Sequence, residues 1–349
     1  MAFSFIRTSL AVLGALAIAW GTPAQAQDAV ASFYKGRDVK LYIGSTPGGG
    51  YDSYGRLLSR YMGKYIPGNP TIVPVNMAGA GSNRLAGYLY AVAPKDGTEF
   101  GIIFPGAVLD PLIGTQQVQD DPSKLIYLGS ANVEVFTCFV RADAAAKTYQ
   151  DAMTSQVLLA ASAAGGSTRD MPALENALLG TKFRVVSGYP GSREINLAIE
   201  QGEVQGACGI GWSSIEIQNP DWITNGKIRV LAQETTKGHP ALDAKGVPLT
   251  YSMAKSDEDR EVMELAYSQE VFGRPFILPP NVPAPRVAAL RKAFMDALTD
   301  KELLAEAAKM RLDIDPISGE DVQALVTKIY SFPANIVAKA KQALVYKDP

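Results

Sequence analysis

A repeated pattern of short apolar strand, glycine-rich loop and amphipathic helix constrains the fold of this chain more than any other feature. In the first half, the pattern predicts strands at 39–43, 71–75 and 100–104, with glycine-rich loops at 46–52 and 79–82. After the first loop, apolar residues recur every three or four positions, which is the period of a helix. Strands that alternate with helices in this way indicate βαβ units and a largely parallel sheet.

The same order returns in the second half of the chain. Strands are predicted at 157–161, 183–186 and 204–210, and the loops at 162–168 and 188–192 are again rich in Gly. A segment of helical period follows each of these two loops. The sequence therefore predicts two α/β halves, each with two glycine-rich loops between a strand and a helix.

Two extended segments connect these halves. The apolar strings at 134–140 and 271–278 read as strands that could carry the chain from one half to the other. We therefore expect two domains, with residues 27–136 and 270–349 in domain 1 and residues 137–269 in domain 2.

The last part of the chain is predicted to be helical. One helix is expected at 286–298, a capping box at 299–302 opens another at 303–310, and a final helix begins after 318–321. The segment 240–264 is polar, punctuated by Pro and Gly, and then charged, so we expect a surface excursion there.

The N-terminus has the pattern of a secretory signal peptide. Arg7 is its only charged residue, an apolar run extends from 10 to 20, and Ala24-Gln25-Ala26 offers an A-x-A cleavage site. The apolar run is shorter than the ~20 residues that span a membrane. A retained N-terminal anchor is the alternative, but we expect cleavage after Ala26 and export of a soluble chain.

Composition excludes several classes of function. The chain has 349 residues, 33 Lys and Arg, 35 Asp and Glu, and a single histidine. One histidine excludes HExxH metalloproteases and three-His zinc sites, so no metal and no cofactor is expected. His239 lies in a turn-like string beside Pro240, which disfavours a Ser-His-Asp triad. The near-neutral charge without a basic block argues against a nucleic-acid partner.

The two cysteines, Cys138 and Cys208, each lie in an apolar string that reads as a strand. In an exported protein they could form a disulfide. Because free cysteines are often buried like small apolar residues, we favour two unpaired thiols.

The glycine-rich loops suggest an anion site. A loop from strand to helix brings backbone N–H groups to a helix N-terminus, where they can hold a carboxylate or phosphate. The loop at 46–52 lacks the Lys-Ser/Thr of a P-loop, and Arg84 stands where a GxGxxG fingerprint needs its last glycine. No GxSxG nucleophile elbow occurs either. For any single loop a tight structural turn is the simpler interpretation, but four equivalent loops favour a ligand cleft.

Four short motifs carry a family resemblance. They read PGGGYDSYGRLL at 47–58, NMAGAGSN at 76–83 with APKDGT at 93–98, GYPG at 188–191 with GEVQ at 202–205, and VPAPRVAAL at 282–290. In this order they resemble the Bug family, the extracytoplasmic solute receptors of tripartite tricarboxylate transporters. Gly55 replaces the usual Ala of that family, Ser82 replaces a Gly, and Lys95 is an insertion.

The resemblance implies a two-domain periplasmic binding protein of the type II-like, Venus flytrap kind, in which each domain is a mixed sheet flanked by helices. It further implies that domain 1 loops hold a carboxylate of the ligand, while Asp52 caps its helix. The domain 1 candidates are Ser45, Thr46, Gly49, Gly50, Tyr51, Gly79, Ala80, Gly81, Ser82, Pro105 and Gly106.

Domain 2 would read the rest of the ligand. Its candidates are Ser167, Thr168 and Arg169, with Tyr189 nearby. Arg169 could pair bidentately with a distal carboxylate, or it could be a solvated arginine at a helix start. Arg193 is the second candidate for that contact.

The expected ligand is a small di- or tricarboxylate, or an aromatic acid. Tyr51 stands where the family has a small residue, and its ring favours a flat or aromatic acid. We expect a periplasmic monomer without enzymatic activity that serves membrane subunits of a tripartite tricarboxylate transporter. The alternatives are an exported α/β hydrolase or transferase, and a partner that presents bound ligand to a sensor kinase.

Overall fold

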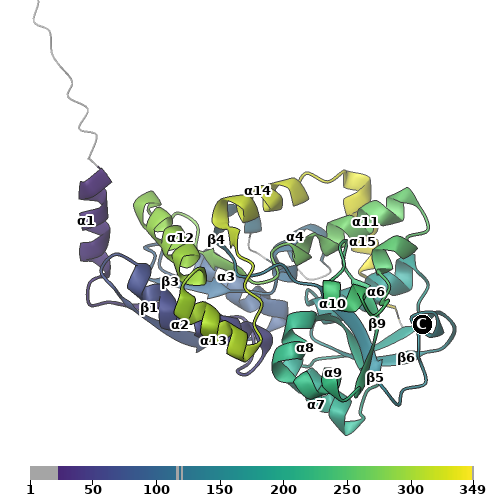
Figure 1. The fold of residues 1–349 in the computed structure, drawn as a ribbon. Helices are drawn as coiled ribbons and strands as arrows, with labels where there is room; N and C mark the ends of the chain where they lie inside the picture. The colour runs from purple at the N-terminus through teal and green to yellow at the C-terminus, as the bar shows by residue number, and fades with distance from the viewer. Residues whose placement is uncertain (1–22, 115–117, 119–120, 348–349) are drawn as a thin grey trace, which may run out of the picture.

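The computed structural model describes residues 23–114, 118 and 121–347, and it contains two β-sheets with helices packed around them (Figure 1). The two sheets lie toward opposite ends of the molecule, and each combines parallel with antiparallel pairs. This confirms the predicted two-part α/β fold with a mixed sheet in each part.

The predicted signal peptide falls mostly on residues 1–22, outside the described residues. Helix α1 (Pro23–Tyr34) runs through the predicted cleavage point after Ala26. Within the described part of the chain, none of the helices combines the length and the apolar character needed to cross a membrane.

The first sheet is built from both ends of the chain. Its strands are β1 (Asp38–Ile43), β2 (Thr71–Asn76), β3 (Glu99–Ile102), β4 (Ile126–Ser130), β10 (Pro275–Leu278) and β11 (Ile317–Ser318). Their order in the sheet is β11-β4-β10-β3-β1-β2. Strand β1 pairs in parallel with β2 and β3, and β10 runs antiparallel between β3 and β4. The loops after β1 and β3 therefore leave the sheet at the same edge.

The second sheet uses only the middle of the chain. Its strands are β5 (Phe136–Arg141), β6 (Val157–Ala161), β7 (Phe183–Ser187), β8 (Gly206–Gly211) and β9 (Ile228–Glu234), in the order β7-β6-β8-β5-β9. Strand β6 is parallel to β7 and β8, whereas β5 is antiparallel to β8 and β9. The chain thus passes from the first sheet to the second between β4 and β5, and returns between β9 and β10.

Helices surround both sheets. Those between strands of the first sheet or after it are α2 (Gly50–Tyr61), α3 (Asn83–Ala91), α4 (Gly106–Ile113), α12 (Ala284–Leu298), α13 (Lys301–Met310) and α14 (Gly319–Ile329). Those of the middle segment are α5 (Asp151–Thr154), α6 (Ser167–Leu178), α7 (Ser192–Gln201), α8 (Trp212–Gln218), α9 (Pro220–Thr224), α10 (Pro240–Asp243) and α11 (Asp257–Tyr267). The last helix is α15 (Ala334–Ala343), and short 3₁₀ turns lie at Met62–Tyr65, Ala80–Ser82, Pro122–Lys124, Thr250–Met253 and Ser268–Glu270.

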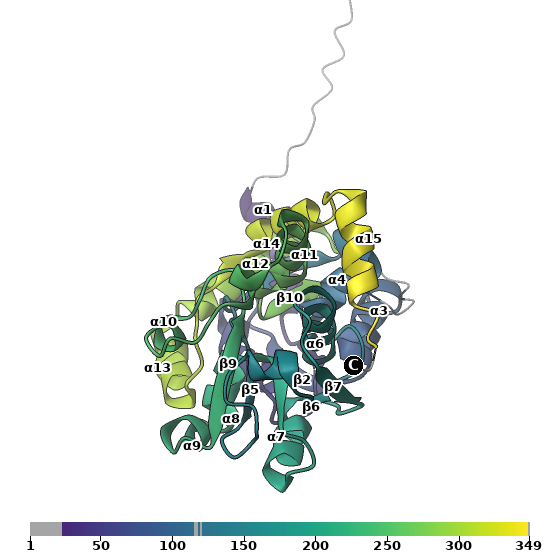
Figure 2. The same ribbon diagram turned by 90° about the vertical axis from the view of Figure 1, so that its right-hand side faces the viewer.

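The C-terminal helix α15 joins the two parts of the molecule. It packs against α4, which follows the first sheet, and against α6 and α11 of the middle segment. Figure 2 shows α15, in yellow, beside α4. The chain therefore links the two parts at α15 as well as at the two segments that cross between the sheets.

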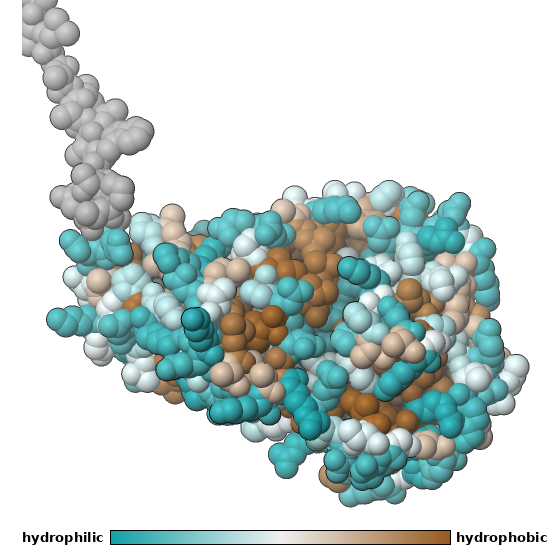
Figure 3. All heavy atoms as spheres, viewed as in Figure 1, coloured by the Kyte–Doolittle hydropathy of each residue, from teal (hydrophilic) through white to brown (hydrophobic). Residues whose placement is uncertain are grey.

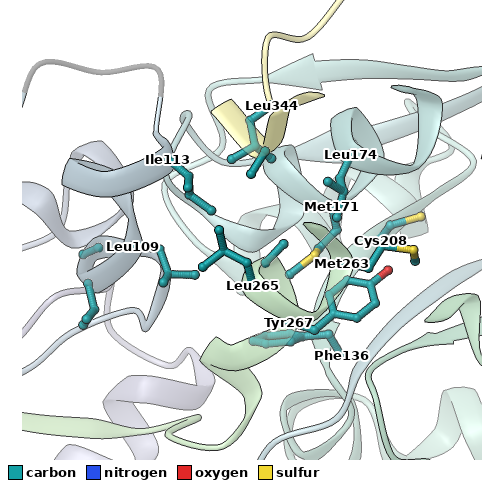
Figure 4. Packing of buried hydrophobic residues seen from close by; sticks show 14 of the residues in the cluster. Leu109, Ile113, Phe136, Met171, Leu174, Cys208, Met263, Leu265, Tyr267 and Leu344 are labelled. Carbon is teal, nitrogen blue, oxygen red and sulfur yellow. The ribbon is translucent and has the colours of Figure 1, made fainter. Parts of the chain in front are cut away.

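A continuous apolar core fills the space beneath α15. Leu109 and Ile113 of α4, Leu265 of α11, Met171 of α6 and Leu344 belong to one cluster of buried residues (Figure 4). On the face seen in Figure 3, hydrophilic residues cover much of the surface and apolar residues gather toward the middle of the molecule. The two parts thus share a hydrophobic core on one side.

The cysteines depart from the prediction of two free thiols, because the structure joins Cys138 and Cys208 in a disulfide. Both residues are buried, as expected for apolar strings. Strands β5 and β8 are antiparallel neighbours, and their register brings the two side chains together. That neighbourhood is a property of the sheet order, which the two isolated strings do not reveal.

Two local predictions near the helices also change. The segment 240–264 is not wholly a surface excursion, because α11 directs its charged first turn outward and buries Val262 and Met263. Helix α13 is capped by Asp300, whose carboxylate accepts a hydrogen bond of 2.7 Å from the N–H of Glu302. The cap therefore lies one residue after Thr299, where the predicted capping box begins.

Candidate functional site

A small, partly open cavity lies where the loops of the two sheets meet. Its volume is about 50 Å³. The first part of the molecule and the crossing segments contribute Ser45, Thr46, Gly49, Gly50, Tyr51, Phe104, Phe136 and Arg274 to its wall. The second part contributes Ser162, Ser167, Thr168, Gly191, Ser192, Ile195, Gly209, Ile210, Gly211 and Ser214.

Three helices begin at this cavity. Gly49 and Gly50 stand at the start of α2, Ser167 and Thr168 at the start of α6, and Ser192 at the start of α7. The first N–H groups of a helix have no partner within the helix, and the helix dipole places partial positive charge there. The cavity therefore has the electrostatic character of an anion site.

Asp52 stabilises the first of these helix starts without facing the cavity. Its carboxylate accepts hydrogen bonds from the N–H of Gly48 at 2.8 Å, from Arg56 at 2.9 Å and from Asn76 at 2.8 Å. Burial raises the pKa of Asp52, but these hydrogen bonds outweigh burial and hold the pKa below its usual value. The N-cap residue itself is Gly49, so Asp52 shapes the loop and is not the predicted cap.

Hydroxyl groups on the second side are held by local hydrogen bonds. The Oγ of Ser167 donates to the carbonyl of Gly209 at 2.7 Å. The Oγ1 of Thr168 accepts from the N–H of Ser162 and lies 2.9 Å from the Oγ of Ser162. From the first part of the molecule, Thr46 Oγ1 donates to Glu194 at 3.1 Å, which ties the loop after β1 to α7.

A buried ion pair lies at the junction of the two crossing segments. Arg274 Nη2 is 2.6 Å from Glu134 Oε2, and the side chains are only 1% and 2% exposed. The same nitrogen donates to Ser213 Oγ at 2.9 Å and to Ser214 Oγ at 3.0 Å, both on α8. Burial lowers the pKa of Arg274, but Glu134 and two neighbouring tyrosines outweigh burial and raise it above its usual value. The guanidinium therefore stays charged.

Aromatic rings form the rest of the wall near this arginine. The ring of Tyr51 lies 4.5 Å from that of Phe104, and the guanidinium of Arg274 lies 4.3 Å above Tyr51. The hydroxyl of Tyr51 donates to the carbonyl of Gly273 at 3.1 Å. Burial raises the pKa of Tyr51 to about 12 despite the nearby arginine, so its hydroxyl is neutral.

The structure brings together part of the predicted site. Seven of the predicted residues line the cavity, namely Ser45, Thr46, Gly49, Gly50, Tyr51, Ser167 and Thr168. The other predicted residues, which are Gly79, Ala80, Gly81, Ser82, Pro105, Gly106, Arg169 and Tyr189, are not among the lining residues.

The loop at 79–82 supports the cavity from outside it. Ser82 Oγ donates to the carbonyl of Gly44 at 2.9 Å and accepts from the N–H of Phe104 at 3.0 Å. Gly81 has a φ of +61°, and a Cβ there would come within 2.9 Å of the backbone of Gly165. Gly106 also meets the backbone of Gly165. These glycines allow the loops of the two parts to touch.

Arg169 and Tyr189 point elsewhere. The guanidinium of Arg169 donates to the backbone carbonyl of Leu344 and to Asp170 at 3.1 Å. The hydroxyl of Tyr189 donates to Glu203 at 3.2 Å.

The lone histidine has a structural role, since Nδ1 of His239 accepts a hydrogen bond of 3.2 Å from the N–H of Ala241 at the start of α10.

Several cavity residues were not predicted, above all Arg274, Phe136 and Ser214. The extended strings at 134–140 and 271–278 could have pointed to them, because residues of segments that cross between two domains adjoin the cleft.

One group among the described residues has the donors for a metal ion. It consists of Cys138, Cys208 and Glu234, but its two sulfur atoms are bonded to each other.

Comparison of the sequence with protein-family models and with curated proteins gave no match. Comparison of the fold with solved structures gave many, including the periplasmic binding protein BugD, which is 20% identical with a TM-score of 0.68 over 90% of this chain and 100% of that one. MatC from Rhodopseudomonas palustris, solved with malate, is 17% identical with a TM-score of 0.67 over 88% of this chain and 99% of that one.

A second R. palustris protein, Rpa4515, was solved with adipate. It is 20% identical, with a TM-score of 0.67 over 88% of this chain and 98% of that one. The chain therefore has the two-part α/β fold of periplasmic binding proteins such as BugD and MatC.

Proposed function

We propose that this protein is a periplasmic solute-binding protein of the Bug type that captures a small organic carboxylate between its two parts. The observation that carries the proposal is the convergence of three helix N-termini and one buried arginine on a single cavity. Partial positive charges and a guanidinium are the groups that hold a carboxylate.

The proposed binding set differs in part from the set expected from the sequence. Ser45, Thr46 and Gly50 contribute from the first part, and Ser167 and Thr168 from the second. The loop at 79–82 positions these residues and does not touch the ligand. Arg169 is left out, because its guanidinium is engaged with the C-terminal segment.

The ligand class, the cellular location and the transport partner are part of the same proposal. MatC and Rpa4515, whose titles name bound malate and adipate, share this fold, which supports a carboxylate as ligand. The signal-peptide pattern at the N-terminus supports a periplasmic location. Delivery to membrane subunits of a tripartite tricarboxylate transporter is the corresponding proposed role, performed by a monomer.

An exported hydrolase or transferase fits the site less well. Ser213 adjoins the lining residue Ser214, and it donates its hydrogen bond to the carboxylate of Glu134. Its Oγ also accepts from Arg274, which lowers the nucleophilicity of the oxygen. His239 serves as the cap of α10. We therefore propose binding without a chemical step.

A thermal-shift screen tests the proposal. A chain that begins at Gln27 is heated with malate, adipate, citrate, hexanoate or benzoate, and with the corresponding amides. At least one acid should raise the melting temperature, because a ligand that binds only the folded state stabilises it. Consumption of an acid, or no response to any acid and no small acid found by native mass spectrometry, would refute the proposal.

A pair of glycine variants checks the location of the site. In Gly50→Ala the new Cβ would meet the side chain of Ser214 across the cavity, so acid binding should weaken at least tenfold. Gly87→Ala is the matched control, because Gly87 also lies in a helix and a Cβ there meets no atom within 4 Å. Equal affinities of the two variants would place the site elsewhere.

A further inference from the structure

Arg274 is the only charged residue among those that line the cavity. Its side chain is almost fully buried, between the ring of Tyr51 at 4.3 Å and that of Tyr54 at 5.0 Å. The two rings and α8 fix the guanidinium in one place. A ligand with an anionic group therefore meets a positive charge that does not move.

The hydrogen-bonding capacity of this guanidinium is not exhausted. Nη1 donates to the carbonyl of Gly273 at 3.0 Å, and Nη2 contacts Glu134, Ser213 and Ser214. Nε is buried and has no hydrogen-bond partner among the described residues. A buried N–H without an acceptor is unfavourable, so an acceptor atom supplied by a ligand would be well placed here.

Glu134 cancels most of the charge that the ligand meets. Its carboxylate is held in place by the N–H groups of Val135 at 3.1 Å and Ser213 at 3.3 Å as well as by Arg274. Since the pair is buried, water does not screen it. The helix N-termini supply the remaining positive potential, which is only a partial charge at each terminus.

The other walls offer no second charged side chain. Besides Tyr51, they consist of the apolar side chains of Phe104, Phe136, Ile195 and Ile210 and of neutral serine and threonine hydroxyls, of which that of Ser167 already donates to Gly209. A second ionised group placed against such walls would lose its hydration without gaining an opposite charge.

We infer that the ligand carries a single carboxylate on an apolar body, and that Glu134 is the residue that excludes diacids by neutralising Arg274. This inference rests on the proposed function and deepens it, since it names the class of acid that the cleft accepts. Glu134 acts through Arg274 and is a specificity-determining residue that need not touch the ligand.

The first test uses matched acids that differ only in a second carboxylate. Binding of benzoate and terephthalate, and of hexanoate and adipate, is measured by calorimetry on the chain that begins at Gln27. The wild-type protein should bind the monoacid of at least one pair tenfold or more tightly than the diacid. Diacids that bind as tightly as their matched monoacids would overturn the inference and leave the proposed function intact. If no acid of any kind binds, the proposed function fails.

The second test changes the charge of the pair. Glu134→Gln keeps the shape of the side chain and leaves Arg274 uncompensated, so the preference for the monoacid should fall at least tenfold. Glu270→Gln is the control, because the Glu270 carboxylate accepts from the N–H of Thr236 at 3.2 Å and does not contact Arg274. Its preference should stay within threefold of the wild type. An unchanged preference in Glu134→Gln overturns the inference.

A double variant covers the case in which Glu134→Gln does not fold, since a buried arginine without its partner is destabilising. Glu134→Gln combined with Arg274→Gln removes both charges together. This protein should keep its preference for the monoacid within threefold of the wild type, because removing both charges leaves the cavity as neutral as the ion pair does. A preference that changes tenfold or more in the double variant would overturn the inference.

Discussion

The Cys138–Cys208 disulfide yields a quantitative prediction for the second half of the molecule. The bond joins residues separated by 70 positions and ties β5 to β8 in the interior of the second sheet. Closing a loop of this length removes conformational entropy from the unfolded chain, which stabilises the folded state by about 4 kcal/mol at 25 °C. Reduction should therefore lower the free energy of unfolding of this half by about that amount.

Tryptophan fluorescence is a suitable probe, because Trp212 and Trp222 are the only tryptophans of a chain that begins at Gln27. Both are buried beside the second sheet. Urea unfolding is followed at equilibrium with and without a thiol reductant, and the midpoint should fall in the reductant. A variant with Cys138→Ala and Cys208→Ala is the control, and its midpoint should not respond to reductant.

Two results would refute this reasoning. Identical urea midpoints for the wild type with and without reductant would show that the bond contributes nothing to stability. Alkylation of both cysteines in protein unfolded without reductant would show that the bond is absent.

Three further predictions concern buried groups. Burial raises the pKa of Glu175 to about 7, so its carboxyl group is protonated in the folded protein below that pH, and stability should fall as the pH rises from about 4.5 to about 7. Glu175→Gln should flatten the pH dependence of the urea midpoint over that range, and an unchanged dependence would contradict the assignment. Asp52→Ala removes the hydrogen bond from the N–H of Gly48 and should cost about 1 kcal/mol in urea unfolding, the usual net contribution of one hydrogen bond. Acid binding should also weaken because the loop at 46–50 loosens, and unaltered stability and affinity would show that the loop does not depend on Asp52. Removal of residues 331–349 uncovers the apolar core beneath α15, and it should lower the free energy of unfolding by about 1.5–3 kcal/mol for each buried Leu or Ile lost. A truncated chain as stable as the full one would show that α15 does not support the fold.

The local order of the fold was predictable because its signals are local. The strand at 38–43, the glycine-rich loop and helix α2 follow one another within 24 residues, and each has its own pattern of apolar and small side chains. The same holds for the loop that starts α6. Seven predicted residues of these two loops and helix starts accordingly line the cavity.

The charged centre of the site was not predictable in this way. Glu134 and Arg274 lie in separate strings, and each string alone reads as an ordinary buried strand. Only the return of the chain to the first sheet brings the two side chains to 2.6 Å. Arg169 was the more obvious candidate because it begins a helix after a glycine loop, but the C-terminal segment occupies its guanidinium.

The shared core beneath α15 has a mechanical consequence for the cleft. Because the two parts are packed together at this core, we expect any separation of them to pivot about α15, so that the cleft widens with distance from it. Where Gly81 and Gly106 meet the backbone of Gly165, the loops of the two parts touch with no side chain between them. The loop after β1 is tied to α7 through the hydrogen bond from Thr46 to Glu194. A pivot that separates this loop from α7 has to break that hydrogen bond.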